Sequence, residues 1–166
     1  MHTRLAPFFL VAVAACGGGG GDLDPDVVTE LPPGDGTGTA ATGTYEMSTV
    51  TTDCAGSCRI EVEGFPYSAC DIGTRLDETA EVTQTDGLLV VDVDDSNYVS
   101  RLEGGIDADG SYEVGGLRTQ NGGEVVITAR SVGTVTGGTW TGTARLLVKG
   151  MGLNCTIEAD ASGTRD

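Results

Sequence analysis

The chain has 166 residues, with 25 acidic and 9 basic side chains and a formal net charge of −16 at pH 7. This length is typical of one domain, and the negative charge excludes attraction to nucleic acid or to anionic lipid headgroups. The single histidine, His2, lies at the extreme N-terminus. The rest of the chain therefore has no histidine for a Ser-His or Cys-His catalytic pair or for a metal site.

The first 15 residues have the layout of an export signal. Residues 1–7 (MHTRLAP) carry positive charge, and residues 8–15 (FFLVAVAA) form an apolar segment. That segment is too short for a membrane-spanning helix, which needs about 20 residues. The small side chains directly before Cys16 resemble the lipobox of bacterial lipoproteins.

The resemblance to bacterial lipoproteins covers only residues 1–16. It implies that residues 1–15 are removed and that Cys16 receives diacylglycerol and an acyl chain, so that the mature protein is anchored in a membrane. Gly17 stands where the family's inner-membrane retention signal has aspartate. The resemblance thus points to the outer membrane, with the periplasmic and cell-surface faces both open. The alternative is an ordinary cleaved signal with an unmodified cysteine.

A segment rich in Gly, Pro and Asp follows Cys16. In residues 17–41 only Val27, Val28 and Leu31 are large and apolar. Because so little apolar surface cannot offset the entropy of ordering the chain, we expect residues 16–41 to form a lipidated, flexible tether. Its predicted reach as a coil is roughly 25–30 Å.

Residues 42–166 have the pattern of an all-β domain. In residues 140–149 (WTGTARLLVK), small or apolar side chains alternate with polar ones, and residues 124–130 and 154–160 show the same period of two. This period predicts strands with one dry and one wet face. Asx-Gly pairs, which favour tight hairpins, separate the runs at Asp86-Gly87, Asp109-Gly110 and Asn121-Gly122.

The spacing predicts an antiparallel meander of roughly eight to ten strands. A long meander is most easily closed as a small up-and-down barrel, lipocalin-like in architecture, because closure removes exposed edges. A two-sheet β-sandwich is the alternative. Alternation predicts the following inward-facing side chains: Tyr45, Met47, Ile60, Val62, Val82, Tyr98, Leu102, Tyr112, Val114, Val125, Ile127, Trp140, Leu146 and Ile157.

Four cysteines remain once Cys16 is set aside. They are Cys54, Cys58, Cys70 and Cys155. An even number in an exported domain predicts two disulfides, and all three pairings stay open. A zinc site is the weaker alternative, because no second close pair accompanies Cys54 and Cys58.

One acidic stretch is a calcium candidate. In residues 92–103 (DVDDSNYVSRLE), Asp92, Asp94, Ser96 and Glu103 occupy ligand positions of an EF-hand loop. The neighbouring sequence reads as strands, whereas an EF-hand needs helices on both sides. A turn of acidic residues between two strands is the competing interpretation.

No motif predicts catalysis, and we expect no enzyme activity and no cofactor beyond the calcium candidate. Three functions remain. The first is a structural or interaction role for an envelope lipoprotein that contacts an unknown envelope protein. The second is a carrier that holds a small apolar ligand in a barrel cavity lined by Tyr45, Tyr98, Tyr112 and Trp140. The third is a calcium-dependent binding module.

Overall fold

A computed structural model describes residues 21–94 and 96–166, and the lipidation candidate Cys16 lies outside these residues. Eight antiparallel strands close into one up-and-down barrel, which confirms the predicted fold class and excludes the sandwich. The strands of the barrel and of one extra hairpin are β1 (Gly43–Ser57), β2 (Arg59–Val62), β3 (Phe65–Ser68), β4 (Arg75–Thr85), β5 (Leu88–Val93), β6 (Arg101–Ile106), β7 (Ser111–Gln120), β8 (Val125–Thr136), β9 (Thr139–Gly150) and β10 (Leu153–Arg165).

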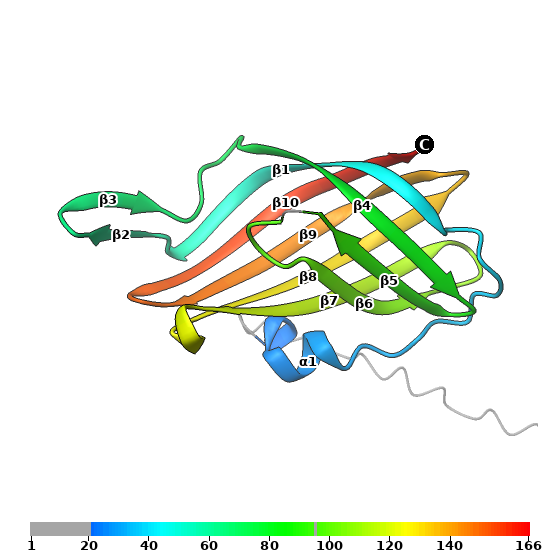
Figure 1. The fold of residues 1–166 in the computed structure, drawn as a ribbon, viewed down its shortest axis with the longest axis horizontal. Helices are drawn as coiled ribbons and strands as arrows, with labels where there is room; N and C mark the ends of the chain where they lie inside the picture. Colours follow the sequence, from blue (N-terminus) through cyan, green and yellow to red (C-terminus); the bar gives the residue numbers. More distant parts are fainter. Residues whose placement is uncertain (1–20, 95) are drawn as a thin grey trace, which may run out of the picture.

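The barrel follows the chain order except at one place. Its strand order is β1-β10-β9-β8-β7-β6-β5-β4, and β4 then pairs with β1 to close the ring. The hairpin β2–β3 is inserted between β1 and β4 and forms a separate two-stranded sheet. Figure 1 shows this hairpin projecting beyond one end of the barrel.

The alternating pattern places apolar side chains inside the barrel. On β9 and β10, Trp140, Val148 and Ile157 are buried, whereas Thr143 and Glu158 are exposed. The inward assignment of Val62 is wrong, since this side chain is 39% exposed. The reason is that β2 pairs only with β3 and lies outside the barrel, so on this face Ile60 still packs against the core while Val62 does not.

The three Asx-Gly pairs lie between strands, as predicted. Asp86-Gly87 joins β4 to β5, and Asp109-Gly110 lies between β6 and β7. Asn121-Gly122 forms a short 3-10 turn, η2 (Asn121–Gly123), between β7 and β8. Asp86 and Asn121 both have positive φ, a conformation that Asx residues adopt more readily than most.

The predicted tether is packed against the barrel over residues 21–41, so the expectation of flexibility is wrong there. The segment contains a 3-10 turn, η1 (Gly21–Leu23), and a short helix, α1 (Pro25–Thr29), which lies along the barrel wall in Figure 1. Leu23 is 1% exposed and Val28 is fully buried. Neither helical element is long and apolar enough to cross a membrane, and the same holds for every helix in the described residues.

Polar contacts explain this docking, which the sparse apolar residues alone do not. The Thr128 hydroxyl on β8 donates a hydrogen bond to the Leu23 carbonyl at 2.8 Å. Further along, the Gly34 amide donates to the Gly87 carbonyl at 2.9 Å. Backbone groups of the segment thus find partners on the barrel.

Gly115 on β7 allows α1 to approach closely. A methyl group at this position would lie 2.5 Å from the carbonyl oxygen of Val28, well inside van der Waals contact. The sequence predicts a bend or bulge at this glycine. In the structure it marks a place where another backbone comes near.

Candidate functional site

Three aromatic side chains close one end of the barrel interior. The rings of Tyr112 and Trp140 lie 4.2 Å apart between centroids, and Tyr45 meets Trp140 edge-on at 6.0 Å. The Tyr45 hydroxyl donates to the Ala41 carbonyl at 3.0 Å, and the Tyr112 hydroxyl bonds the Ser131 hydroxyl at 3.0 Å. These three buried rings, of which the two tyrosines are hydrogen-bonded, form a packed floor.

Burial raises the pKa of the Tyr112 hydroxyl, and its contacts with Ser131 and Trp140 partly offset this effect. The indole N–H of Trp140 lies near this hydroxyl without hydrogen-bond geometry, and it has no hydrogen-bond partner in the described structure. This buried donor is the least satisfied polar group at the floor.

A cavity of about 300 Å³ lies inside the barrel above this floor. Of the four aromatic residues predicted to line a cavity, Trp140 and Tyr98 do so. Tyr45 and Tyr112 do not line it, because they fill the space on the other side of Trp140. The predicted cavity residues are thus split between the cavity wall and the packed end of the barrel.

The cavity exists because three neighbouring strands present small side chains at the same level. Ala159 on β10 is paired with Ala144 on β9, which is paired in turn with Ser131 on β8. Larger apolar side chains surround this band and complete the wall: Met47, Leu76, Val91, Val93, Leu102, Leu146 and Ile157. Polar side chains complete the lining: Thr49, Thr51, Ser68, Asp71, Thr74, Glu78, Ser96, Arg130 and Ser131. A largely apolar wall with placed polar groups is typical of a site for small organic molecules.

One carboxyl group faces the cavity. Alternation on β4 places Glu78 on the same face as Leu76 and the buried residues Ala80 and Val82. Burial raises the pKa of Glu78, and a hydrogen bond with Ser96 partly offsets this increase. No arginine or lysine of the described chain lies within salt-bridge distance of Glu78.

Sequence analysis missed Glu78 as a site residue. The signal was present in residues 75–85, where Glu78 and Gln84 are the two polar side chains on an otherwise apolar face of the alternation. In the sequence, the small residues of the band are far apart. Strand register decides which of them become neighbours in the sheet. Register is a property of the folded sheet rather than of any single strand.

Two segments frame the mouth of the cavity. The first is residues 68–74, which follow β3 and include exposed Asp71 and Thr74 at the cavity rim. The second is the loop between β5 and β6, which brings Ser96 and half-buried Tyr98 to the opposite side. Burial raises the pKa of Tyr98, and the nearby acidic groups Tyr67, Glu78 and Asp71 raise it further.

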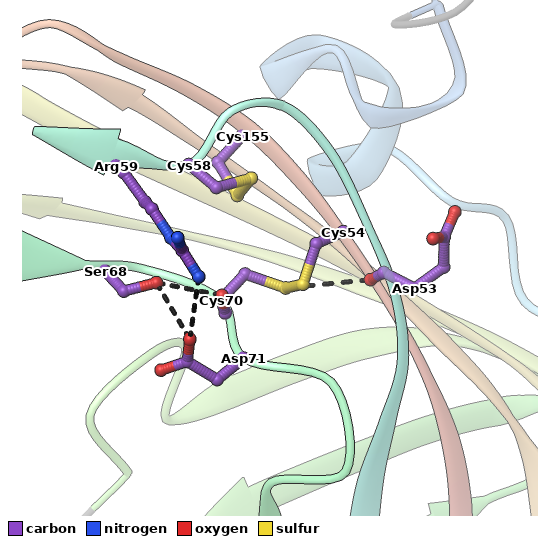
Figure 2. A network of polar contacts seen from close by, with 8 residues as sticks. All are labelled: Asp53, Cys54, Cys58, Arg59, Ser68, Cys70, Asp71 and Cys155. Atoms are coloured by element: carbon purple, nitrogen blue, oxygen red, sulfur yellow. Dashed lines mark hydrogen bonds and ion pairs between the residues drawn. A yellow bond between two sulfur atoms is a disulfide. The ribbon is translucent and has the colours of Figure 1, made fainter.

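Covalent and ionic contacts hold these segments in place. Cys54 is paired with Cys70, and Cys58 with Cys155, which confirms two disulfides and settles their pairing. Figure 2 shows Ser68, Arg59 and Asp71 meeting beside Cys70. The Ser68 hydroxyl lies 2.9 Å from the Cys70 carbonyl oxygen, and Arg59 lies 3.8 Å from the Asp71 carboxylate.

The loop on the opposite side is fixed by Arg118 of β7. Its guanidinium donates to the carbonyl oxygens of Ser96 and Tyr98 at 2.6 and 3.2 Å. Arg118 therefore acts on the mouth by holding the loop.

The calcium candidate does not form an EF-hand, because strands β5 and β6 flank the loop instead of helices. Asp92 and Glu103 both bind Arg101, at 3.0 and 2.6 Å, on the exposed face of the sheet. Ser96 faces the cavity mouth instead, and Asp94 is exposed. Residues 21–94 and 96–166 contain no group of three His, Cys, Asp or Glu side chains placed to hold a metal ion.

The arrangement can enclose a small molecule between the Trp140 floor and the mouth at Tyr98. Apolar side chains form most of the wall, and the charged residues of the lining are Glu78, Asp71 and Arg130. Comparison with known proteins gives no family model, no curated protein and no solved structure that matches this chain.

Proposed function

We propose that this protein is a non-catalytic binding protein that holds a small, largely apolar ligand inside its barrel. The observation that carries the proposal is the cavity of about 300 Å³, with an apolar wall and an ordered aromatic floor. Apolar cavities of this kind stay poorly hydrated, so a fitting apolar molecule gains contacts without displacing well-bound water.

The lipobox resemblance adds a location to this proposal. We propose that Cys16 is the lipidated first residue of the mature chain and that the barrel is anchored to the outer membrane. A carrier in that position would take up its ligand at the membrane surface. The resemblance of residues 1–16 is the support for this part of the proposal.

A second candidate function is contact with another envelope protein through the hairpin β2–β3. Its support is the exposure of large apolar side chains on and next to the hairpin: Phe65 is 74% exposed, Ile72 67% and Tyr67 52%. Exposed apolar groups gathered on one projecting element are a common feature of interaction surfaces.

Titration of the chain from Gly17 onward with 1-octanol tests the carrier proposal. This form contains every described residue and needs no detergent, which would compete for the cavity. Trp140 is the only tryptophan and lines the cavity, so octanol binding is expected to shift or quench its fluorescence. An unchanged spectrum at saturating octanol would contradict the proposal.

A pair of variants shows whether the response comes from the cavity. Ala144→Phe places a large ring among the small side chains that leave the cavity open, and it is expected to abolish the response. Thr143→Phe adds the same ring to the exposed face of β9 and is expected to leave the response unchanged. An equal loss in both variants would argue against binding inside the barrel.

A further inference from the structure

The charge distribution of the cavity identifies the kind of ligand it fits. We propose that the ligand is a small organic amine, bound as an ammonium cation that pairs with Glu78 while its hydrocarbon part fills the apolar cavity. This inference rests on the proposed carrier function and specifies its ligand class.

The first step is the position of Glu78. It projects into the cavity from β4, next to Leu76 and Ala80 and directly across from Met47 on β1. The ladder between β4 and β5 ends nearby, where Ala80 pairs with Val93. Glu78 is thus near the mouth, where a charged group can stay partly hydrated while the ligand's apolar part goes deeper.

Within the described chain, the Glu78 carboxylate has no cationic partner. Arg130 is among the residues that line the cavity, but its guanidinium pairs with Glu113 at 2.6 Å. Arg118 donates to the carbonyl oxygens of Ser96 and Tyr98 at the mouth. Burial of a carboxylate without a cation is unfavourable. A bound ammonium group supplies the missing positive charge and offsets that cost.

The charges at the cavity disfavour an anionic ligand. A fatty acid would bring a second carboxylate beside Glu78, with Asp71 also at the cavity rim. Like charges in a partly buried site repel each other strongly. The net charge of −16 adds a long-range field that attracts cations and repels anions.

The fourth step is the aromatic ring beside the carboxyl group. Tyr98 lies near enough to Glu78 for the carboxylate to raise the pKa of its hydroxyl. A cation next to Glu78 therefore has a tyrosine ring and hydroxyl close by, and aromatic rings attract ammonium groups. The polar part of the site thus suits a cation in two ways.

Three probes with the same chain length separate charge from hydrophobicity: n-octylamine, 1-octanol and n-octanoate. Binding to the chain from Gly17 onward is measured at pH 7.5 by calorimetry and by Trp140 fluorescence. Octylamine is expected to bind about tenfold more tightly than octanol, because a charge-assisted contact is added to the same apolar burial. Octanoate is expected to bind most weakly.

Glu78→Gln removes the charge and keeps the shape of the side chain. This variant is expected to lose about tenfold in octylamine affinity while keeping its octanol affinity, which also shows that the barrel remains folded. Glu81→Gln is the matched control, since Glu81 lies on the exposed face of the same strand and bonds Thr44. It is expected to leave all three affinities unchanged.

The outcomes separate the two proposals. Equal binding of octylamine and octanol, or equal octylamine binding by wild type and Glu78→Gln, would overturn the amine inference and leave the carrier function standing. Failure of all three probes to bind would overturn both. A tighter complex with octanoate than with octylamine would also refute the amine inference.

Discussion

Asp22 forms an ion pair with Arg145 although 123 positions separate them in the sequence. Asp22 is in η1, before the barrel begins, and Arg145 is on the outer face of β9. The neighbouring Arg130 lies 3.8 Å from the same carboxylate. This pairing helps to hold the N-terminal segment on the barrel wall.

Removal of the Asp22 carboxylate is expected to loosen this segment. Asp22→Asn should lower the free energy of unfolding by about 1 kcal/mol, since the ion pairs are about one-third exposed and partly screened. Urea unfolding measures this change, and hydrogen exchange should show faster amide exchange in residues 21–29. Asp26→Asn, on the exposed side of α1, is the control. Equal effects of the two substitutions would contradict the assignment.

The two disulfides are expected to differ in their effects on stability and binding. Cys58–Cys155 closes a loop of 97 residues and Cys54–Cys70 one of 16. Loop-closure entropy predicts losses of about 5 and about 3 kcal/mol when each pair is replaced by serines. Urea unfolding of the two double variants checks this order.

The loss of octanol affinity in the same two variants should follow the reverse order, with the larger loss in the Cys54–Cys70 variant. Cys70 lines the cavity and fixes residues 68–74 at its mouth, whereas Cys58–Cys155 does not line it. Loss of Cys54–Cys70 is therefore expected to weaken octanol binding more. If the Cys58–Cys155 variant binds octanol more weakly while still folded, the role given to the mouth segment is wrong.

The stability of the protein should depend on the ionisation of Glu78. Burial raises the pKa of Glu78 in the folded state above the ordinary value of 4.5. Below pH 4.5 the group is protonated in both states, but as the pH rises through the folded pKa, ionisation favours the unfolded chain. Glu78→Gln is therefore expected to be more stable than wild type at pH 7.

This advantage of Glu78→Gln should shrink towards zero near pH 4. Urea midpoints measured at pH 4 and pH 7 test it, with Glu81→Gln as the comparison on the exposed face of β4. A Glu78→Gln variant that is less stable than wild type at pH 7 would contradict a half-buried carboxyl group without a cationic partner.

Lipidation of Cys16 has a direct test in the intact protein. Mass spectrometry of protein extracted from host membranes should show a chain that begins at Cys16 and carries acyl groups. Cys16→Ser should abolish the acylation and the membrane association. A mature chain of unmodified mass that begins elsewhere would refute the lipoprotein interpretation.

Alternation predicted the barrel because both faces of its strands have distinct surroundings. On β8, β9 and β10 the predicted inward residues Ile127, Trp140 and Ile157 are all buried. The same pattern misled at Val62, since its hairpin lies outside the barrel and only Ile60 on that face of β2 packs against the core. Local periodicity reports which side chains share a face and not what that face contacts.

The docked N-terminal segment was missed for a different physical reason. Its attachment depends on Asp22, on backbone carbonyls such as that of Leu23, and on the space above Gly115. These partners are all far away in sequence and belong to other strands. Its composition indicates that the segment cannot fold by itself. This is compatible with a segment that becomes ordered on the wall of the folded barrel.

The packed segment also limits how far the barrel can stand from a bilayer. Only residues 17–20 separate Cys16 from η1, and a fully extended chain from Cys16 to Gly21 covers at most about 18 Å. A lipid on Cys16 would thus keep η1, and with it the wall of β7–β9 on which the segment packs, close to the bilayer surface.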